Sequence, residues 1–159
     1  MKYHIITIGK IKEAYLTAGM NEFLKRMKPF AQVEITVLAE EKMPTRPSPA
    51  EKMQVLEKEG AKLSAHIRDT SYIYALDVQG RLLSSECLAA QMEEQAVHGY
   101  SEFTFIIGGP FGLAESVRTR AHQCISFGRM TFTHQMMRLL LLEQLYRVNK
   151  IQRHEPYHW

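Results

Sequence analysis

Short apolar runs alternate with longer segments of helical spacing along the chain. The runs predict five strands, at Tyr3–Gly9, Val33–Leu38, Tyr72–Val78, Phe103–Ile107 and Cys124–Phe127. Apolar residues three and four positions apart predict five helices, at Ile11–Lys28, Pro49–Ile67, Ser84–His98, Leu113–His122 and Thr133–Asn149. Alternating strands and helices predict an α/β fold, with a mostly parallel sheet and helices on both faces.

Local signals indicate where several of these elements begin and end. Proline is favourable in the first turn of a helix, where Pro49 stands. Ser84 and Thr133 can each cap the helix that follows. Gln79-Gly80 is a turn signal, so we expect the chain to turn away after the third strand.

The last predicted helix is apolar around nearly its whole circumference. Its apolar positions are Met136, Met137, Leu139, Leu140, Leu141, Leu142, Leu145, Tyr146 and Val148. A helix that is apolar on all sides has to be buried on all sides. In a domain this small a second subunit can supply that cover, so the sequence favours a homodimer; a central helix of a monomer is the alternative.

Size and composition indicate one globular domain over residues 1–159. No apolar run approaches the roughly 20 residues that cross a bilayer, and no signal-peptide pattern opens the chain. Cys87 and Cys124 stand alone, which argues against a disulfide framework and against a Cys-x-x-Cys metal site. We therefore expect a cytoplasmic protein without a membrane segment.

Positive charge is concentrated at the C-terminal end. From Arg118 onward there are seven Lys and Arg against two acids, whereas residues 1–117 carry thirteen bases and fifteen acids. A basic end on a near-neutral body indicates an anionic partner, RNA foremost. An ordinary solvated helix face is the alternative, and charge alone does not decide between them.

Two glycine-bearing loops indicate a small-molecule pocket in the C-terminal half. Gly108–Gly112 follows a buried strand, where open α/β sheets bind ligands. Its Gly-Gly-x-x-Gly spacing differs from the dinucleotide motif, and no P-loop Lys-Ser/Thr follows it. The second loop, Ser126–Phe132, combines free backbone amides with apolar side chains, a mixture that suits an adenine. The alternative for the first loop is a tight turn without a ligand, and the alternative for the apolar side chains of the second loop is packing in the core.

The C-terminal tail combines charged, imidazole and aromatic groups. Pro156 lies between His154 and His158 and opposes a helix there, so a metal-binding histidine pair is not expected. Such a tail suits stacking on a single-stranded nucleotide, although a packed terminus is also possible. Just before it, Glu143 and Arg147 have the favourable i,i+4 orientation, which also fits an ordinary helix-surface pair.

Taken together, these motifs resemble the small SPOUT-class methyltransferases of the RlmH type. The resemblance covers essentially the whole chain. Its most specific parts are FxFxIGG at Phe103–Gly109, SFGRMTFTHQMMR at Ser126–Arg138, LEQLYR at Leu142–Arg147 and the terminal Glu155–His158. It implies a SPOUT fold whose C-terminal part forms a trefoil knot, which the periodicity does not reveal, and a homodimer. It also implies a cofactor, S-adenosylmethionine, and a substrate, N3 of a pseudouridine in 23S rRNA, on assembled ribosomes.

The resemblance also implies which residues bind and react. Cofactor contacts fall on Leu76, Gly108, Phe127, Gly128, Arg129, Met130, Thr131 and Phe132. The residues around the target base are Glu143, Arg147, Tyr157 and His158. His158 is expected to act as base or orienting donor, and Arg147, oriented by Glu143, to hold a phosphate or a developing oxyanion. Tyr157 is expected to stack on the base or hydrogen-bond to it, and no metal is needed.

Two other functions remain open from the sequence. A non-catalytic RNA- or ribosome-binding module could retain the fold, although such a module has no need for both glycine loops. The second is a SPOUT methyltransferase with a different specificity, such as methylation of a tRNA ribose 2′-O or of guanine N1. The short chain and the Tyr157-His158 tail argue against it.

Overall fold

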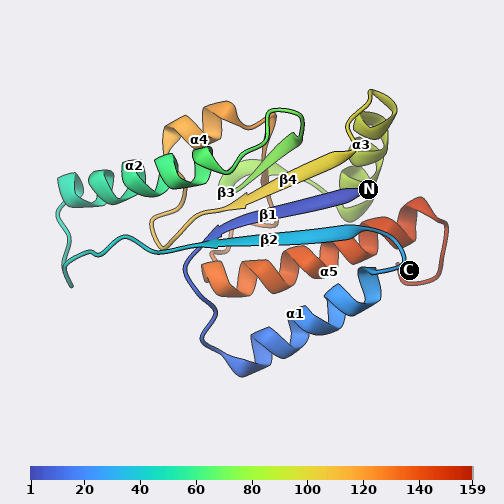
Figure 1. The fold of residues 1–159 in the computed structure, drawn as a ribbon, viewed down its shortest axis with the longest axis horizontal. Helices are drawn as coiled ribbons and strands as arrows, with labels where there is room; N and C mark the ends of the chain where they lie inside the picture. The colour runs from blue at the N-terminus through green and yellow to red at the C-terminus, as the bar shows by residue number, and fades with distance from the viewer. Residues whose placement is uncertain (159) are drawn as a thin grey trace.

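A five-stranded sheet, parallel throughout, runs through the computed structural model, which describes residues 1–158 (Figure 1). The strand order is β2-β1-β4-β3-β5. The strands are β1 (Lys2–Ile8), β2 (Gln32–Leu38), β3 (Tyr72–Leu82), β4 (Glu102–Ile107) and β5 (Gln123–Ser126). Each neighbouring pair is in parallel register, which confirms the predicted type of sheet.

Helices cover both faces of the sheet, as predicted. In Figure 1, α2 (Pro49–Ala65) and α4 (Glu115–Arg120) lie on one side of the strands, and α1 (Ala14–Met27) and α5 (His134–Gln152) on the other. The remaining helix, α3 (Ser85–Val97), packs against α5. The α/β architecture is therefore layered, with helix, sheet and helix in turn.

Alternate side chains along the strands belong to two separate hydrophobic cores, one on each face of the sheet. In β1, Tyr3 and Ile5 join the cluster under α1, α3 and α5, whereas Ile6 and Ile8 join the cluster under α2 and α4. Successive side chains of a strand point to opposite faces, so a strand buried on both faces reads as a continuous apolar run. The strands could be recognised in the sequence for this reason.

Side-chain caps fix the starts of three helices. Ser48 forms a capping box with Glu51 at the start of α2, which has Pro49 in its first turn. The hydroxyl of Ser84 accepts from the amide of Cys87, and that of Thr133 accepts from the amide of Met136 at 3.1 Å. Each bond satisfies an amide that the helix itself leaves free. The predicted caps at Ser84 and Thr133 are confirmed.

Several predicted boundaries were wrong. α1 begins at Ala14 instead of Ile11, and α5 continues to Gln152 beyond Asn149. β3 does not end at Gln79-Gly80 but continues to Leu82: its ladder with β5 is interrupted after Leu76 and resumes at Arg81. The turn signal therefore marks an irregularity inside a strand. The helix predicted at Leu113–His122 spans only Glu115–Arg120, because the backbone is extended at Ala114 before it and at Ala121 after it. Leu113 and Ala114 are buried against α2.

Other elements of the same chain cover much of α5. No residue from His134 to Gln152 is exposed, and α5 packs against α1, α3 and the sheet. Only six of its nineteen residues are buried, namely Arg138, Leu141, Leu142, Leu145, Val148 and Asn149, so the predicted burial on all sides is met in part within one chain. Met136, Met137, Leu139, Leu140 and Tyr146 stay half-buried in the single chain, and the homodimer stays a prediction. Within residues 1–158, no helix is long and apolar enough to span a membrane.

Candidate functional site

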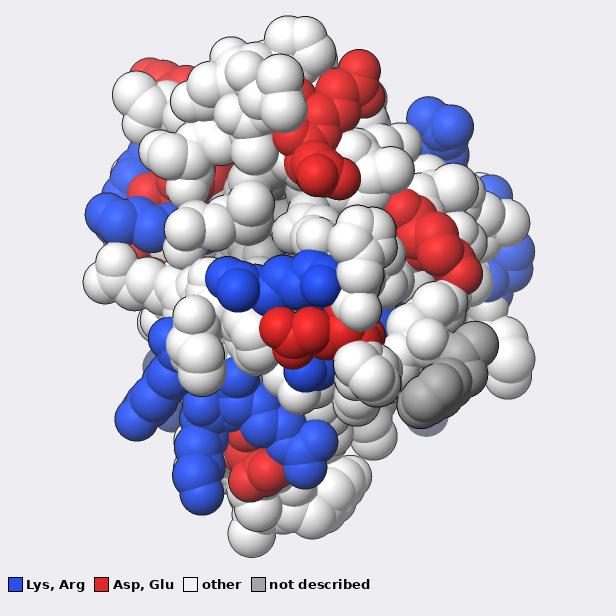
Figure 2. Space-filling view, turned by 90° about the vertical axis from the view of Figure 1, so that its right-hand side faces the viewer, with Lys and Arg blue, Asp and Glu red and all other residues white. Residues whose placement is uncertain are grey.

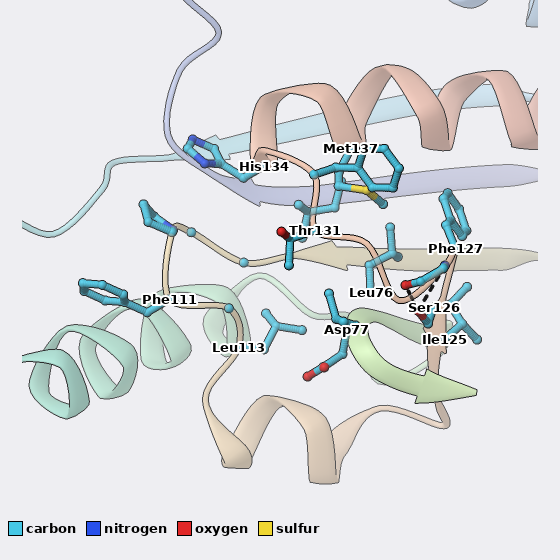
Figure 3. Close-up of a pocket in the computed structure, with 18 of the residues that line it drawn as sticks. Leu76, Asp77, Phe111, Leu113, Ile125, Ser126, Phe127, Thr131, His134 and Met137 are labelled. Atoms are coloured by element: carbon cyan, nitrogen blue, oxygen red, sulfur yellow. Dashed lines mark hydrogen bonds between the residues drawn. The ribbon is translucent and has the colours of Figure 1, made fainter. Parts of the chain in front are cut away.

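A cavity of about 360 Å³ opens at the carboxyl ends of β4 and β5, beside the middle of β3 (Figure 3). Its walls are Leu76–Val78 of β3, the loop after β4, the loop after β5 and the first turn of α5. Figure 3 shows Phe111 at one end and Phe127 at the other, with Met137 of α5 on one side and Leu113 on the opposite side. Parallel α/β sheets bind ligands at this edge.

The loop after β4 is both a tight turn and a wall of the cavity. The amide of Gly112 donates to the carbonyl of Gly109 at 3.0 Å, and Gly112 has a φ of 85°. A Cβ on Gly108 would collide with the carbonyl of Gly112. Only glycine fits such a turn, and the same lack of side chains leaves bare backbone facing the cavity.

The loop after β5 presents apolar side chains that are not part of the core. Met130 is 79% exposed and Phe132 is 47% exposed, while both line the cavity with Phe127. The hydroxyl of Ser126 accepts from the amide of Gly128 at 3.2 Å and donates to its carbonyl at 2.7 Å, which fixes the bend. Core packing, the alternative from sequence, therefore does not apply to Met130 or Phe132.

Seven of the eight residues expected at the cofactor line the cavity: Leu76, Gly108, Phe127, Gly128, Met130, Thr131 and Phe132. The eighth residue, Arg129, does not line the cavity. It donates to the carbonyl of Gly80 at 3.0 Å and to that of Val78, so it ties the loop to the irregular part of β3. This side chain supports the wall of the cavity from behind.

The cavity also holds polar groups that sequence reasoning missed. Asp77 and Arg118 both line it and pair at 3.0 Å, and Arg118 also pairs with Glu115 at 2.8 Å. His134, at the start of α5, has its pKa lowered by burial, although the Glu40 carboxylate 3.1 Å away opposes this. The position of Asp77, near the carboxyl end of a buried strand, was the available signal.

A buried carboxylate supports the loop after β4. Glu59 of α2 is 2% exposed, and its Oε1 accepts from the amide of Glu41 at 3.1 Å. A Cβ on Gly109 would lie 2.8 Å from Glu59 Oε2. Burial raises the pKa of Glu59 above its ordinary value. No pattern in the sequence distinguishes this residue from the other acids of α2.

The four residues expected around the target base lie together at the other end of α5. Arg147 Nη2 donates to Glu143 Oε1 at 2.5 Å, and the hydroxyl of Tyr157 donates to the same oxygen at 3.0 Å. The guanidinium of Arg147 lies over the ring of Tyr157, 4.8 Å from its centroid, and 3.2 Å from Nδ1 of His158. We call Glu143, Arg147, Tyr157 and His158 the tail cluster.

Glu86 is a fifth contact that the sequence did not predict. Its carboxylate lies 2.5 Å from Nε2 of His158. Its own backbone amide, the hydroxyl of Ser84 and His158 lower its pKa to about 2. The only signal was its place in the first turn of α3, which gave no reason to pair it with a tail 72 positions later.

Within one chain, the tail cluster is separated from the cavity. Arg147 stands thirteen positions after His134 on α5, about 20 Å along the helix axis. A second cavity, of about 480 Å³, lies between them and is lined by Phe127 and Phe132 as well as by Glu86 and Gln144. In residues 1–158, no group of three or more His, Cys, Asp or Glu is arranged to hold a metal ion.

Known proteins match this chain over nearly its whole length. Residues 1–158 match a family model described as a predicted SPOUT methyltransferase. Proteins named ribosomal RNA large subunit methyltransferase H are similar: that of Enterococcus faecalis is 47% identical, and those of Listeria monocytogenes and Halothermothrix orenii are 48% identical. Each alignment spans 158 residues and 99% of both chains.

A solved structure has a similar fold. It is the structure of a probable methylase family protein from Haemophilus influenzae, with a TM-score of 0.55 and 13% sequence identity. The match covers 99% of this chain and 70% of that one. At this identity the likeness concerns the fold alone.

Proposed function

The chain belongs to the SPOUT methyltransferase family, and from that membership we propose that it methylates N3 of a pseudouridine in 23S rRNA, with S-adenosylmethionine as methyl donor. The observation that carries this proposal is the identity of 47–48% over 99% of both chains to large-subunit rRNA methyltransferases. The cavity and the tail cluster supply residues that suit the two halves of such a reaction.

The cavity residues fit S-adenosylmethionine. A volume of about 360 Å³ lies in the range of small-ligand pockets, and the walls combine apolar side chains with bare backbone. Leu76, Phe127 and the backbone of 128–132 would hold the adenine. When bound, the cofactor supplies an electrophilic methyl group on a sulfonium.

The proposed fold includes the trefoil knot of the family. The loop after β4 and the loop after β5 line the same cavity, and α5 then packs between α1 and α3. This proximity of two late loops and the last helix supports a chain end that passes through an earlier loop.

A homodimer would complete the active site. Because none of the four residues of the tail cluster lines the cavity of its own chain, the tail of a second copy is the simplest way to bring a tail cluster to the cavity. Exposed Met130 and Phe132 at the cavity rim supply apolar surface for such a contact. The proposed enzyme is therefore a dimer with two composite sites.

In the proposed reaction, the tail cluster accepts the proton of the target base and stabilises the negative charge that develops on it. N3 carries an imide proton that has to leave as the nitrogen is methylated, and His158 is suited to accept it. Both ring nitrogens of His158 are engaged, one toward Arg147 and one toward Glu86, so one contact must be released first. Arg147 then stabilises negative charge on the uracil ring, with Glu143 fixing its orientation.

Transfer of a radiolabelled methyl group tests this function. The protein is incubated with labelled S-adenosylmethionine and either assembled ribosomes or naked 23S rRNA fragments. We expect label in the RNA of assembled ribosomes and much less in the fragments, because a chain this small depends on a large structured substrate for affinity. Ribosome binding without transfer would instead favour the non-catalytic module. A ribosomal substrate would also place the enzyme in the cytoplasm.

A further inference from the structure

Basic side chains gather where α1 and α5 end, next to the tail cluster. The last turn of α1 and the residue after it carry Lys25, Arg26 and Lys28, and α5 ends with Lys150 followed by Arg153. Figure 2 shows Lys and Arg grouped low on this face, around a small acidic area. We call these five residues the basic patch.

Aromatic rings contact three of the five cations of the basic patch, namely Arg26, Lys150 and Arg153. The guanidinium of Arg26 lies 6.0 Å from the centroid of the Tyr146 ring, and Arg153 and Lys150 lie 4.9 Å and 5.5 Å from that of Phe30. Cation–π contacts of this kind restrict long, flexible side chains. Less conformational entropy is then lost when such a side chain binds an anion.

The basic patch keeps a surplus of positive charge. Glu22 pairs with Arg26 at 2.7 Å, and Glu155 pairs with Lys150. The other three cations are exposed and have no carboxylate within ion-pair distance among the described residues: Lys25, Lys28 and Arg153. Two acids thus face five bases, and three of the bases are free to neutralise an external anion.

We propose that the basic patch binds the phosphate backbone of the RNA that carries the target nucleotide. This rests on the proposed function. Lys150 is one helical turn beyond Arg147, and Arg153 is four positions before Tyr157, so the patch borders the residues expected around the target base. Phosphate contacts position an RNA without reading its sequence, which leaves recognition to the tail cluster.

An anionic membrane is a weaker match for the same charges. Stable surface binding needs apolar side chains that enter the bilayer beside the basic ones. Here Phe30 and Tyr146 are half-buried, and cations lie over their rings. The patch therefore offers charge without an apolar group to insert.

The test compares two triple variants with the same change of charge. Lys25→Gln with Lys28→Gln and Arg153→Gln removes the free cations of the patch. Lys42→Gln with Arg46→Gln and Lys58→Gln removes three exposed cations of α2 and the loop before it. Filter binding gives the affinity for ribosomes and for a 23S rRNA fragment between 50 and 200 mM KCl, roughly the range over which phosphate contacts are lost.

We expect the patch variant to lose about 10- to 100-fold in affinity at 50 mM KCl and to lower the salt slope by about 2, since each phosphate contact contributes about 0.7–0.9. The control variant should match the wild-type protein. Circular dichroism and S-adenosylmethionine binding establish that both variants are folded. A Lys25→Glu, Lys28→Glu variant, which leaves Arg153 on its ring, should show the same direction of change.

Equal salt slopes for the patch variant and the wild-type protein would overturn the proposal. So would a patch variant that loses binding to equimolar phosphatidylcholine–phosphatidylserine vesicles while its RNA affinity is unchanged. The outcome is separate from that of the proposed function. Wild-type protein that binds RNA through the patch but transfers no methyl group would contradict the function alone, and transfer with an irrelevant patch would contradict this inference alone.

Discussion

Gly108 lies where no side chain fits, because a Cβ would meet the carbonyl of Gly112 inside the turn. Gly108→Ala should push this turn into the cavity, lower stability by about 1–3 kcal/mol and weaken S-adenosylmethionine binding at least about tenfold, by analogy with other overpacked sites. Calorimetry well below the melting temperature measures the binding. Gly99→Ala is the matched control: Gly99 has a φ of 102° in a turn after α3, so it should cost stability and leave binding intact. Similar binding by both variants would contradict the role of Gly108.

His158 is expected to move a proton and not to bind the cofactor. His158→Ala should keep the S-adenosylmethionine affinity and lower methyl transfer by about 10²–10⁴, the usual contribution of a general base. Single-turnover transfer to ribosomes and calorimetry separate the two effects. His154→Asn is the control, because His154 is exposed in the same tail. Full transfer by His158→Ala would remove His158 from the mechanism.

The buried carboxyl of Glu59 gives a pH dependence with a definite sign. Its pKa is raised in the folded protein, so the neutral form is favoured there, and stability falls as pH rises from the ordinary value of 4.5 through the raised one. Glu59→Gln can keep the bond to Glu41 and cannot ionise. Urea unfolding at pH 5 and pH 8 should show the variant gaining on the wild-type protein at the higher pH. Exposed Glu57→Gln should show no such gain, and a pH-independent difference for Glu59→Gln would refute the assignment.

Among the helices and strands, local rules predicted most of the fold. The β1 and β4 runs are apolar on both faces because two cores meet there, and the caps at Ser84 and Thr133 need only neighbouring amides. The predictions that were wrong concern positions whose structure is set by residues far away in the sequence. Gln79-Gly80 has the composition of a turn, but the backbone of β5 packs against Gly80 and keeps the chain in the sheet.

In the candidate sites, too, features built from residues close in sequence were predicted, and contacts between residues far apart in sequence were missed. The cavity loops follow from glycine and apolar residues that are close in sequence, whereas Asp77 with Arg118 and His158 with Glu86 are contacts between residues 41 and 72 positions apart. Periodicity carries no information at such separations. The resemblance to a family identified the tail residues, and the structure added the carboxylate of Glu86.

Arg129 connects two elements, since its side chain bonds to carbonyls of β3 from the loop after β5. Arg129→Gln should loosen residues 127–132, speed their amide hydrogen exchange and weaken S-adenosylmethionine binding about three- to tenfold, the equivalent of losing about 1 kcal/mol. Arg120→Gln, which breaks bonds to Ser64 and Asp69 on the surface of α4, is the control. Unchanged exchange in the loop would show that Arg129 does not support it.

For the whole molecule, apolar periodicity predicted burial of α5 on all sides, whereas the structure buries six of its nineteen residues and leaves the others half-buried. α1 and α3 pack against it, so the case for a dimer now rests on the tail cluster, none of whose residues lines the cavity of its own chain. Co-expression of Gly108→Ala and His158→Ala chains tests that case. A composite site predicts that mixed dimers regain about half of one wild-type dimer's activity, because one of their two sites is intact. Sites built within single chains predict no recovery at all.

The identity of the methylated nucleoside tests the central claim most directly. Ribosomes that lack the modification are incubated with the enzyme and S-adenosylmethionine, and their 23S rRNA is digested to nucleosides for mass spectrometry. The account predicts that N3-methylpseudouridine appears with wild-type protein and is absent with His158→Ala. A methyl group found only on ribose, on guanine or on another RNA would contradict it, as would ribosomes that gain no methyl group.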